Sequence, residues 1–136
     1  MDILIVEDNP AHQKITEYVL KRNNVSARMS VVRDGQEAID FLYHRAAYAD
    51  HEASPAPDLI LLDLNLPKRD GREVLRIIKH DTGLKSIPVI IVSTSDRPED
   101  VAYALQIGAV AYVSKSSGFD KFTVELAAAM KSAMGG

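Results

Sequence analysis

Runs of aliphatic residues alternate with longer amphipathic stretches along this chain, and the pair repeats five times. The aliphatic runs predict strands at residues 3–6, 27–32, 59–62, 89–92 and 111–113. The first, third and fourth runs are aliphatic throughout, which is typical of strands buried on both faces. The second run alternates with Arg28 and Ser30 and favours an edge strand. The pattern therefore predicts a parallel sheet with helices on both faces.

The stretches between these runs carry apolar residues at helical spacing, and each predicts a helix with one face on the sheet. Those faces consist of Ala11, Ile15, Tyr18 and Val19; of Ala38, Ile39, Leu42 and Ala46; of Val74, Leu75 and Ile78; and of Phe119, Phe122, Leu126, Ala129, Met130 and Ala133. Pro98 suits the first turn of a further helix, and Asp96 before it is a candidate N-cap.

Five strands alternating with five helices, joined by right-handed crossovers, predict an α/β fold. We expect a doubly wound five-stranded parallel sheet of order 2-1-3-4-5. One connection, at residues 48–57, is long and polar and ends in proline, and it predicts a loop that extends the second helical segment. No linker is visible in the sequence, so we expect a single domain over residues 1–136.

Composition narrows the class of protein. With 46% apolar and 26% charged residues the chain is typical of a globular protein, and the absence of cysteine excludes disulfides, thiolate zinc sites and a cysteine nucleophile. No apolar run approaches the roughly 18 residues that cross a bilayer. The N-terminus has acids where a signal peptide is basic, so we expect a cytoplasmic location. A net charge of -3 disfavours direct binding to nucleic acid.

Polar residues follow the strands at their carboxyl ends, where ligands bind in sheets of this kind. They are Glu7 and Asp8, then Asp63 and Asn65, then Ser93, Thr94 and Ser95, and finally Ser114, Lys115, Ser116 and Ser117. If the first and third strands are neighbours about 4.8 Å apart, three carboxylates crowd together and repel unless a cation lies between them. Mg²⁺ is the natural occupant because it prefers oxygen ligands.

An acidic pocket with one lysine and several hydroxyls suits phosphoryl transfer to a carboxylate. Asp63 ends the central strand and is our candidate nucleophile. Lys115 would neutralise charge on the phosphoryl oxygens, and Ser93 would donate a hydrogen bond to one of them. Glu7 and Asp8, on the neighbouring strand, are better placed as metal ligands, with Glu7 acting through water.

Each residue also has an ordinary structural explanation, and it is the joint occurrence at four strand ends that favours a site. Asp8, for example, precedes a helix and is suited to cap it. The four histidines, His12, His44, His51 and His80, share no metal-binding spacing, and we interpret them as surface residues. A basic series favours a solvated helix face, with a partner contact as the alternative. Its members are Lys68, Arg69, Arg72, Arg76 and Lys79.

The whole chain resembles a response-regulator receiver domain, a family with the flavodoxin- and CheY-like fold. The residues that carry the resemblance are the Glu7-Asp8 pair, residues 63–71 (DLNLPKRDG), Ser93, and residues 108–115 (GAVAYVSK). The resemblance implies a two-component signalling protein, without an output domain, in which Asp63 accepts a phosphoryl group.

The resemblance also implies partners, a cofactor and a switch. The donor would be a sensor histidine kinase or a phosphotransfer protein, and small phosphodonors would also react. Mg²⁺ would be held by Asp8, Asp63 and the main-chain carbonyl of Asn65, and by Glu7 through water. Ser93 would move toward the phosphoryl group while Tyr112 swings inward.

Two positions depart from the family pattern. Ser116 stands where the family usually has a proline after the active-site lysine, which allows this loop to run trans and to place Lys115 differently. Thr94 stands where a very small residue is common beside the switch hydroxyl. Because its side chain narrows the access of water to the phosphoryl group, we expect slow autodephosphorylation.

A narrower resemblance links the chain to stand-alone regulators of bacterial phytochrome kinases. It rests on the long loop at residues 48–57, on residues 40–43 (DFLY) and on residues 63–67 (DLNLP). It implies a phytochrome histidine kinase as the partner, with any chromophore on that kinase.

Two helices are apolar beyond the face that the sheet needs. The excess residues are Val101, Ala102, Tyr103, Ala104, Leu105 and Ile107 in the fourth helix, and Val124, Ala127, Ala128 and Met134 in the fifth. A helix that is apolar nearly all round needs a second buried contact. We therefore expect a homodimer through the fourth helix, fifth strand and fifth helix, the alternative being that the alanines are simply helix formers.

Two other functions are compatible with the fold. An aspartate-nucleophile phosphatase would use Asp63, but Asn65 replaces the second acid that turnover requires. A phosphate-independent interaction module would use the same surfaces without chemistry. A flavodoxin-like cofactor site is excluded because Glu7 and Asp8 would repel a bound phosphate.

Overall fold

Five strands pair in parallel in the order β2-β1-β3-β4-β5, as the sequence predicted. The computed structural model describes residues 1–23, 25–50 and 55–134. The strands are β1 Asp2–Val6, β2 Arg28–Val32, β3 Leu59–Leu62, β4 Val89–Ser93 and β5 Ala111–Ser114. The helices are α1 Pro10–Arg22, α2 Gly35–Leu42, α3 Gly71–His80, α4 Pro98–Ile107 and α5 Phe119–Ala133, with 3₁₀ turns η1 Ala46–Tyr48 and η2 Lys115–Ser117.

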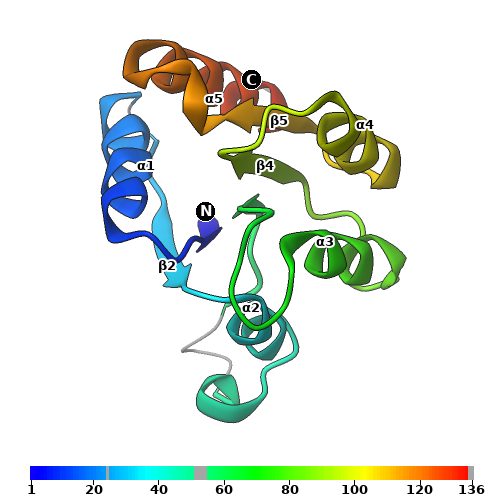
Figure 1. Ribbon diagram of the computed structural model, residues 1–136. Helices are drawn as coiled ribbons and strands as arrows, with labels where there is room; N and C mark the ends of the chain where they lie inside the picture. Colours follow the sequence, from blue (N-terminus) through cyan, green and yellow to red (C-terminus); the bar gives the residue numbers. More distant parts are fainter. Residues whose placement is uncertain (24, 51–54, 135–136) are drawn as a thin grey trace.

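The helices cover the two faces of the sheet (Figure 1). Helices α1 and α5 lie on one face, and α2, α3 and α4 lie on the other. The expected edge position of the second strand is confirmed, since β2 pairs only with β1 in the described sheet. All strands point the same way, so their carboxyl ends meet at one edge, where the loops that carry the site begin.

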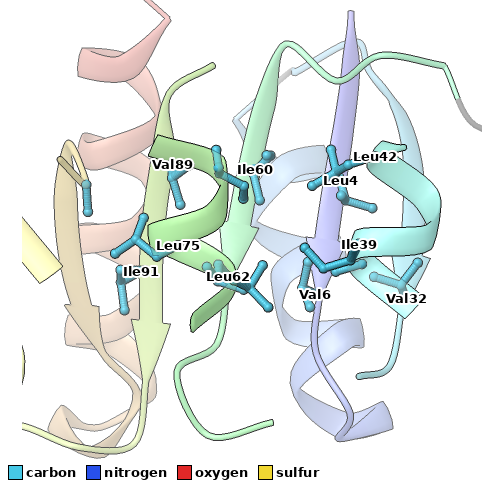
Figure 2. Close-up of a cluster of buried hydrophobic side chains, with 14 of the residues drawn as sticks. Leu4, Val6, Val32, Ile39, Leu42, Ile60, Leu62, Leu75, Val89 and Ile91 are labelled. Atoms are coloured by element: carbon cyan, nitrogen blue, oxygen red, sulfur yellow. The ribbon is translucent and has the colours of Figure 1, made fainter. Parts of the chain in front are cut away.

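The sheet divides the hydrophobic core into two clusters. Along β1, Leu4 and Val6 face α2 and α3, whereas Ile3 and Ile5 face α1 and α5. Figure 2 shows the first cluster, in which side chains of β1, β3 and β4 meet Ile39 of α2 and Leu75 of α3. Strands β1, β3 and β4 are buried almost completely, as their aliphatic sequences predicted.

Five details of the sequence prediction are wrong. Ala11 was expected to face the sheet but is exposed. The N-cap of α4 is Arg97 rather than Asp96, and Arg97 makes no side-chain capping bond. Tyr18 and Phe119 were expected to face the sheet but are 46% and 53% exposed, with their ring centroids 6.1 Å apart. Ala46 lies in η1 beyond the end of α2 and is exposed. A pattern of apolar residues locates a stripe on a helix but not the rotation that centres the stripe on the sheet.

The long connection after α2 contains η1 and then the stretch that leads into β3. Part of the predicted loop, residues 51–54, and with it His51, lies outside the described residues. Among the residues described, no helix is long and apolar enough to cross a membrane.

Candidate functional site

Three carboxylates gather at the carboxyl ends of β1 and β3. Val6 pairs with Leu62, and the amide of Asp63 donates to the carbonyl of Val6 at 3.1 Å, so the residues after both strands lie side by side. One ligand oxygen from each of Glu7, Asp8 and Asp63 lies within 4.8 Å of the others. Glu7 and Asp63 are buried and Asp8 is exposed, so one side of the cluster is open to solvent.

Lys115 reaches this cluster from the end of β5. Its Nζ donates to Oδ2 of Asp63 at 2.9 Å and to Oε1 of Glu7, and its side chain is only 6% exposed. No cis peptide bond occurs in the described chain, as expected with Ser116 in place of proline. With Ser116 in place of proline, Lys115 still reaches the acid cluster, where its ammonium contacts both buried carboxylates.

The electrostatics of the cluster favour an added positive charge. Burial raises the pKa of Glu7 to about 7, although hydrogen bonding and attraction from Lys115 oppose the shift. The negative charge of Asp63 raises the pKa of Glu7 further, because the two carboxylates repel and share a single ammonium. Half of the molecules would therefore carry a proton on Glu7 near neutral pH.

The backbone around Asp63 is tightly enclosed. The amide of Asn65 donates to Oδ1 of Asp63 at 2.9 Å, which fixes the carboxylate from the side opposite to Lys115. Gly71 begins α3 against this strand end, and a Cβ there would lie 2.1 Å from the carbonyl oxygen of Asp63. Only glycine therefore fits where α3 starts.

The predicted switch residues belong to one hydrogen-bonded chain. Ser93 is fully buried, and its Oγ accepts from the side-chain amide of Asn65 at 3.4 Å and from the amide of Ser95 at 3.2 Å. The hydroxyl of Tyr112 donates to the carbonyl oxygen of Ser95 at 2.7 Å. Thr94, between Ser93 and Ser95 in the sequence, is exposed.

This series of hydrogen bonds continues into α3 and α4, a connection that the sequence did not predict. Ser95 Oγ donates to Asp100 Oδ2 at 2.5 Å, and Arg72 donates to Asp100 Oδ1 at 2.8 Å. These bonds from Ser95 and Arg72 hold the pKa of Asp100 below its ordinary value. Arg72 is therefore not part of a solvated basic face. Lys79 likewise donates to the carbonyls of Lys85 and Ile87.

The position of His12 also differs from the sequence prediction. It was interpreted as a surface residue, yet its Nδ1 lies 3.2 Å from Nζ of Lys115. Burial and the positive charge of Lys115 lower the pKa of His12. The available signal was its position in the first turn of a helix that follows the acidic pair.

The other predicted hydroxyls lie in the turn after β5. Ser114 Oγ is 2.8 Å from Ser116 Oγ, and Ser117 Oγ donates to the carbonyl of Ser114 at 3.0 Å. These bonds are local to η2 and its flanks. They shape the turn that carries Lys115.

The donor set suits a hard divalent cation. Carboxylate oxygens from three residues converge, one side is open to water, and the ligands identified include no sulfur and no imidazole. Glu7, Asp8 and Asp63 are the residues that would hold such an ion.

The doubly wound sheet, with an acid cluster and a lysine at its carboxyl edge, is the arrangement expected of a receiver domain. The family model for the response regulator receiver domain matches residues 3–127, and the chain belongs to this family. The sequence is 44% identical over 114 residues to response regulator Rcp1 of Synechocystis sp., which covers 84% of this chain and 76% of the relative.

Solved structures agree with this assignment. The Mn²⁺-bound form of response regulator Rcp1 matches with a TM-score of 0.86 at 38% identity, over 96% of this chain and 91% of the other. The phosphorylated cyanobacterial phytochrome response regulator RcpA matches with a TM-score of 0.87 at 38% identity, over 98% and 93%. The chain is thus a response regulator receiver that is similar to phytochrome response regulators.

Proposed function

We propose that Asp63 accepts a phosphoryl group from a sensor histidine kinase in a Mg²⁺-dependent reaction. The observation that carries the proposal is the contact of Lys115 Nζ with Asp63 Oδ2 at 2.9 Å inside a cluster of three carboxylates. A carboxylate oxygen of Asp63 forms a P–O bond as the P–N bond of the donor breaks, and the histidine of the kinase leaves with the bonding electron pair.

The residues of the chain divide the work. Asp8, Asp63 and the main-chain carbonyl of Asn65 would hold Mg²⁺, and Glu7 would bind it through water. Bound Mg²⁺ supplies positive charge against the phosphoryl oxygens. Lys115 supplies a second positive charge from the side of β5, and the buried Asp63 is kept in place by the amide of Asn65.

Ser93 and Tyr112 act as the switch. Ser93 Oγ accepts from the side-chain amide of Asn65 and from the backbone amide of Ser95, so its hydroxyl proton is available for a phosphoryl oxygen. Movement of Ser93 toward Asp63 would carry Ser95 along and break the bond from Tyr112. Tyr112 then turns inward, and the surface of α4, β5 and α5 changes.

The partners follow from the relatives. Several similar structures bear the name of a phytochrome or bacteriophytochrome response regulator. We therefore place this chain downstream of a bacterial phytochrome kinase, directly or through a phosphotransfer protein. In this proposal the receiver acts in the cytoplasm, without direct contact with nucleic acid or membrane.

The protein also associates with itself in this proposal. Leu105 of α4 and Val110 before β5 are 46% and 51% exposed, which is unusual for large apolar side chains on one edge. Their exposure supports the α4, β5 and α5 surface as the proposed homodimer interface. Val124, 68% exposed, lies instead beside Tyr18 in the hollow between α1 and α5.

Intact-mass spectrometry after incubation with acetyl phosphate and Mg²⁺ tests the central proposal. We expect one phosphoryl adduct on the wild type, none without metal and none on Asp63→Asn. Repeated turnover of p-nitrophenyl phosphate would favour the phosphatase alternative. The absence of an adduct from the wild type would favour a phosphate-independent interaction module.

A further inference from the structure

His12 meets the active-site lysine from α1. Its backbone amide donates to Oδ1 of Asn9, the N-cap of the helix, at 3.3 Å, and this places the ring beside the strand ends. Nδ1 of the ring lies 3.2 Å from Nζ of Lys115, and the side chain is only 32% exposed. The contact joins the first turn of α1 to the end of β5, on the face of the sheet opposite to α2 and α3.

The chemistry of the two groups fixes the direction of this bond. An ammonium has three protons and no lone pair, so Lys115 is always the donor. Two protons go to Glu7 Oε1 and Asp63 Oδ2, and the third goes to Nδ1 of His12. The ring proton must then be on Nε2. Glu7 Oε1 is 3.7 Å from the same Nδ1, too far for a competing hydrogen bond.

The side chain of Lys115 has space for a second position of its ammonium group. A hollow of about 150 Å³ opens beside it, lined by His12, Ile15, Lys115, Phe119 and Phe122. The hollow has room for water around an ammonium group. A lysine side chain has many rotamers, so holding one of them requires bonds that define the position of Nζ.

We propose that His12 is a positioning residue that keeps the Lys115 ammonium over Asp63 by accepting its third proton. The inference rests on the proposed phosphoryl acceptance by Asp63. Without the imidazole, the ammonium keeps two partners but spends time rotated toward the hollow, where it no longer faces the incoming phosphoryl group.

Three variants test the role of the ring nitrogen. His12→Leu removes the acceptor, His12→Asn places an amide oxygen near the position of Nδ1, and His80→Leu removes an exposed histidine of α3 as the control. At saturating Mg²⁺ we expect His12→Leu to form the adduct with acetyl phosphate about tenfold more slowly. His12→Asn and His80→Leu should stay within about twofold of the wild type.

Nitrogen-15 spectra of the histidine rings give a readout that needs no phosphorylation. In the metal-free wild type, His12 should show the tautomer with its proton on Nε2 and a bare Nδ1. A proton on Nδ1 would overturn the proposal, as would equal rates for His12→Leu and wild type, or an Asn variant as slow as Leu.

The outcomes separate this inference from the function on which it rests. If the wild type forms no adduct, the proposed function fails and the tautomer alone decides whether His12 holds Lys115. If His12→Leu does not fold, the rate of His12→Asn and the tautomer decide. An adduct on the wild type with no loss in His12→Leu leaves the function standing and removes the role of His12.

Discussion

Two buried carboxylates and one ammonium lie at the centre of the site, and the pKa of Glu7 is raised as a result. Glu7 must lose its proton before it can face a cation, and its pKa is about 7. The proton and the metal therefore compete for the same residue.

The competition predicts a pH dependence of metal binding. Below pH 7 the fraction of deprotonated Glu7 falls with each unit of pH, so the affinity for Mg²⁺ should drop about tenfold between pH 8 and pH 6. Titration calorimetry at both pH values measures it. Glu7→Gln, which has no proton to lose, should bind more weakly and with little change over this range; an equally steep dependence in the variant would contradict the assignment.

Thr94 controls the lifetime of the phosphoryl group in our account. It lies exposed next to the buried Ser93, where we expect its side chain to narrow the access of water to the phosphoryl group. We expect Thr94→Ala to shorten the lifetime several-fold, measured as loss of the mass adduct after removal of the donor. Thr82→Ala, at an exposed turn remote in sequence, serves as the control. A lifetime unchanged in Thr94→Ala would show that the side chain does not limit water.

Site residues that directly follow a strand could be predicted from the sequence. Residues whose location depends on how a helix is rotated about its axis could not. Glu7, Asp63 and Lys115 follow strands whose order is set by topology, so their convergence could be foreseen. His12 and Asp100 act through the faces of α1 and α4 on which they lie. Their contacts with Lys115 and Arg72 join residues distant in sequence, and hydrophobic periodicity carries no information on such pairs.

Among the elements, α3 and α4 are tied together through Arg72 and Asp100. Their side chains are 30% and 11% exposed, so the ion pair is partly shielded from water. Removing the arginine leaves Asp100 with Ser95 as its remaining hydroxyl donor. The loop that carries Ser93 and Ser95 thereby loses part of its support.

Arg72→Met should therefore lower the free energy of unfolding by about 1–2 kcal/mol, less than a fully buried pair would cost. Urea denaturation monitored by circular dichroism measures the change. Arg76→Met, at an exposed position of the same helix, should change it by less than about 0.5 kcal/mol. Equal effects of the two substitutions would mean that the ion pair contributes nothing.

The start of α3 is fixed by a close backbone contact at Gly71. Since a methyl group there would lie 2.1 Å from the carbonyl of Asp63 and 2.6 Å from Cα of Leu64, the strand end or the helix must move. We expect Gly71→Ala to lower the free energy of unfolding by at least about 2 kcal/mol. The same denaturation experiment measures it, with Gly83→Ala, where the nearest neighbour is a flexible carboxylate at 3.2 Å, as the milder comparison. A neutral Gly71→Ala would refute the contact.

For the whole molecule, the exposed apolar side chains on the α4, β5 and α5 surface predict a homodimer. A charged side chain introduced on that surface should disrupt it. The wild type should have the mass of two chains by light scattering at high concentration. Leu105→Glu should have the mass of one, because it buries a carboxylate in the proposed interface. Val124 faces α1, so the Val124→Glu variant should remain dimeric. A monomeric wild type, with and without phosphorylation, would exclude the dimer.

The division of the core by the sheet has a consequence for how this protein changes over generations. Ile3 and Ile5 belong to the cluster under α1 and α5, while Leu4 and Val6 belong to the cluster under α2 and α3. Side chains in different clusters do not pack on one another, so a substitution on one face places no steric demand on the other. The two faces are therefore free to diverge separately, each toward its own partners, while the strands between them keep Asp63 in register with Glu7 and Asp8.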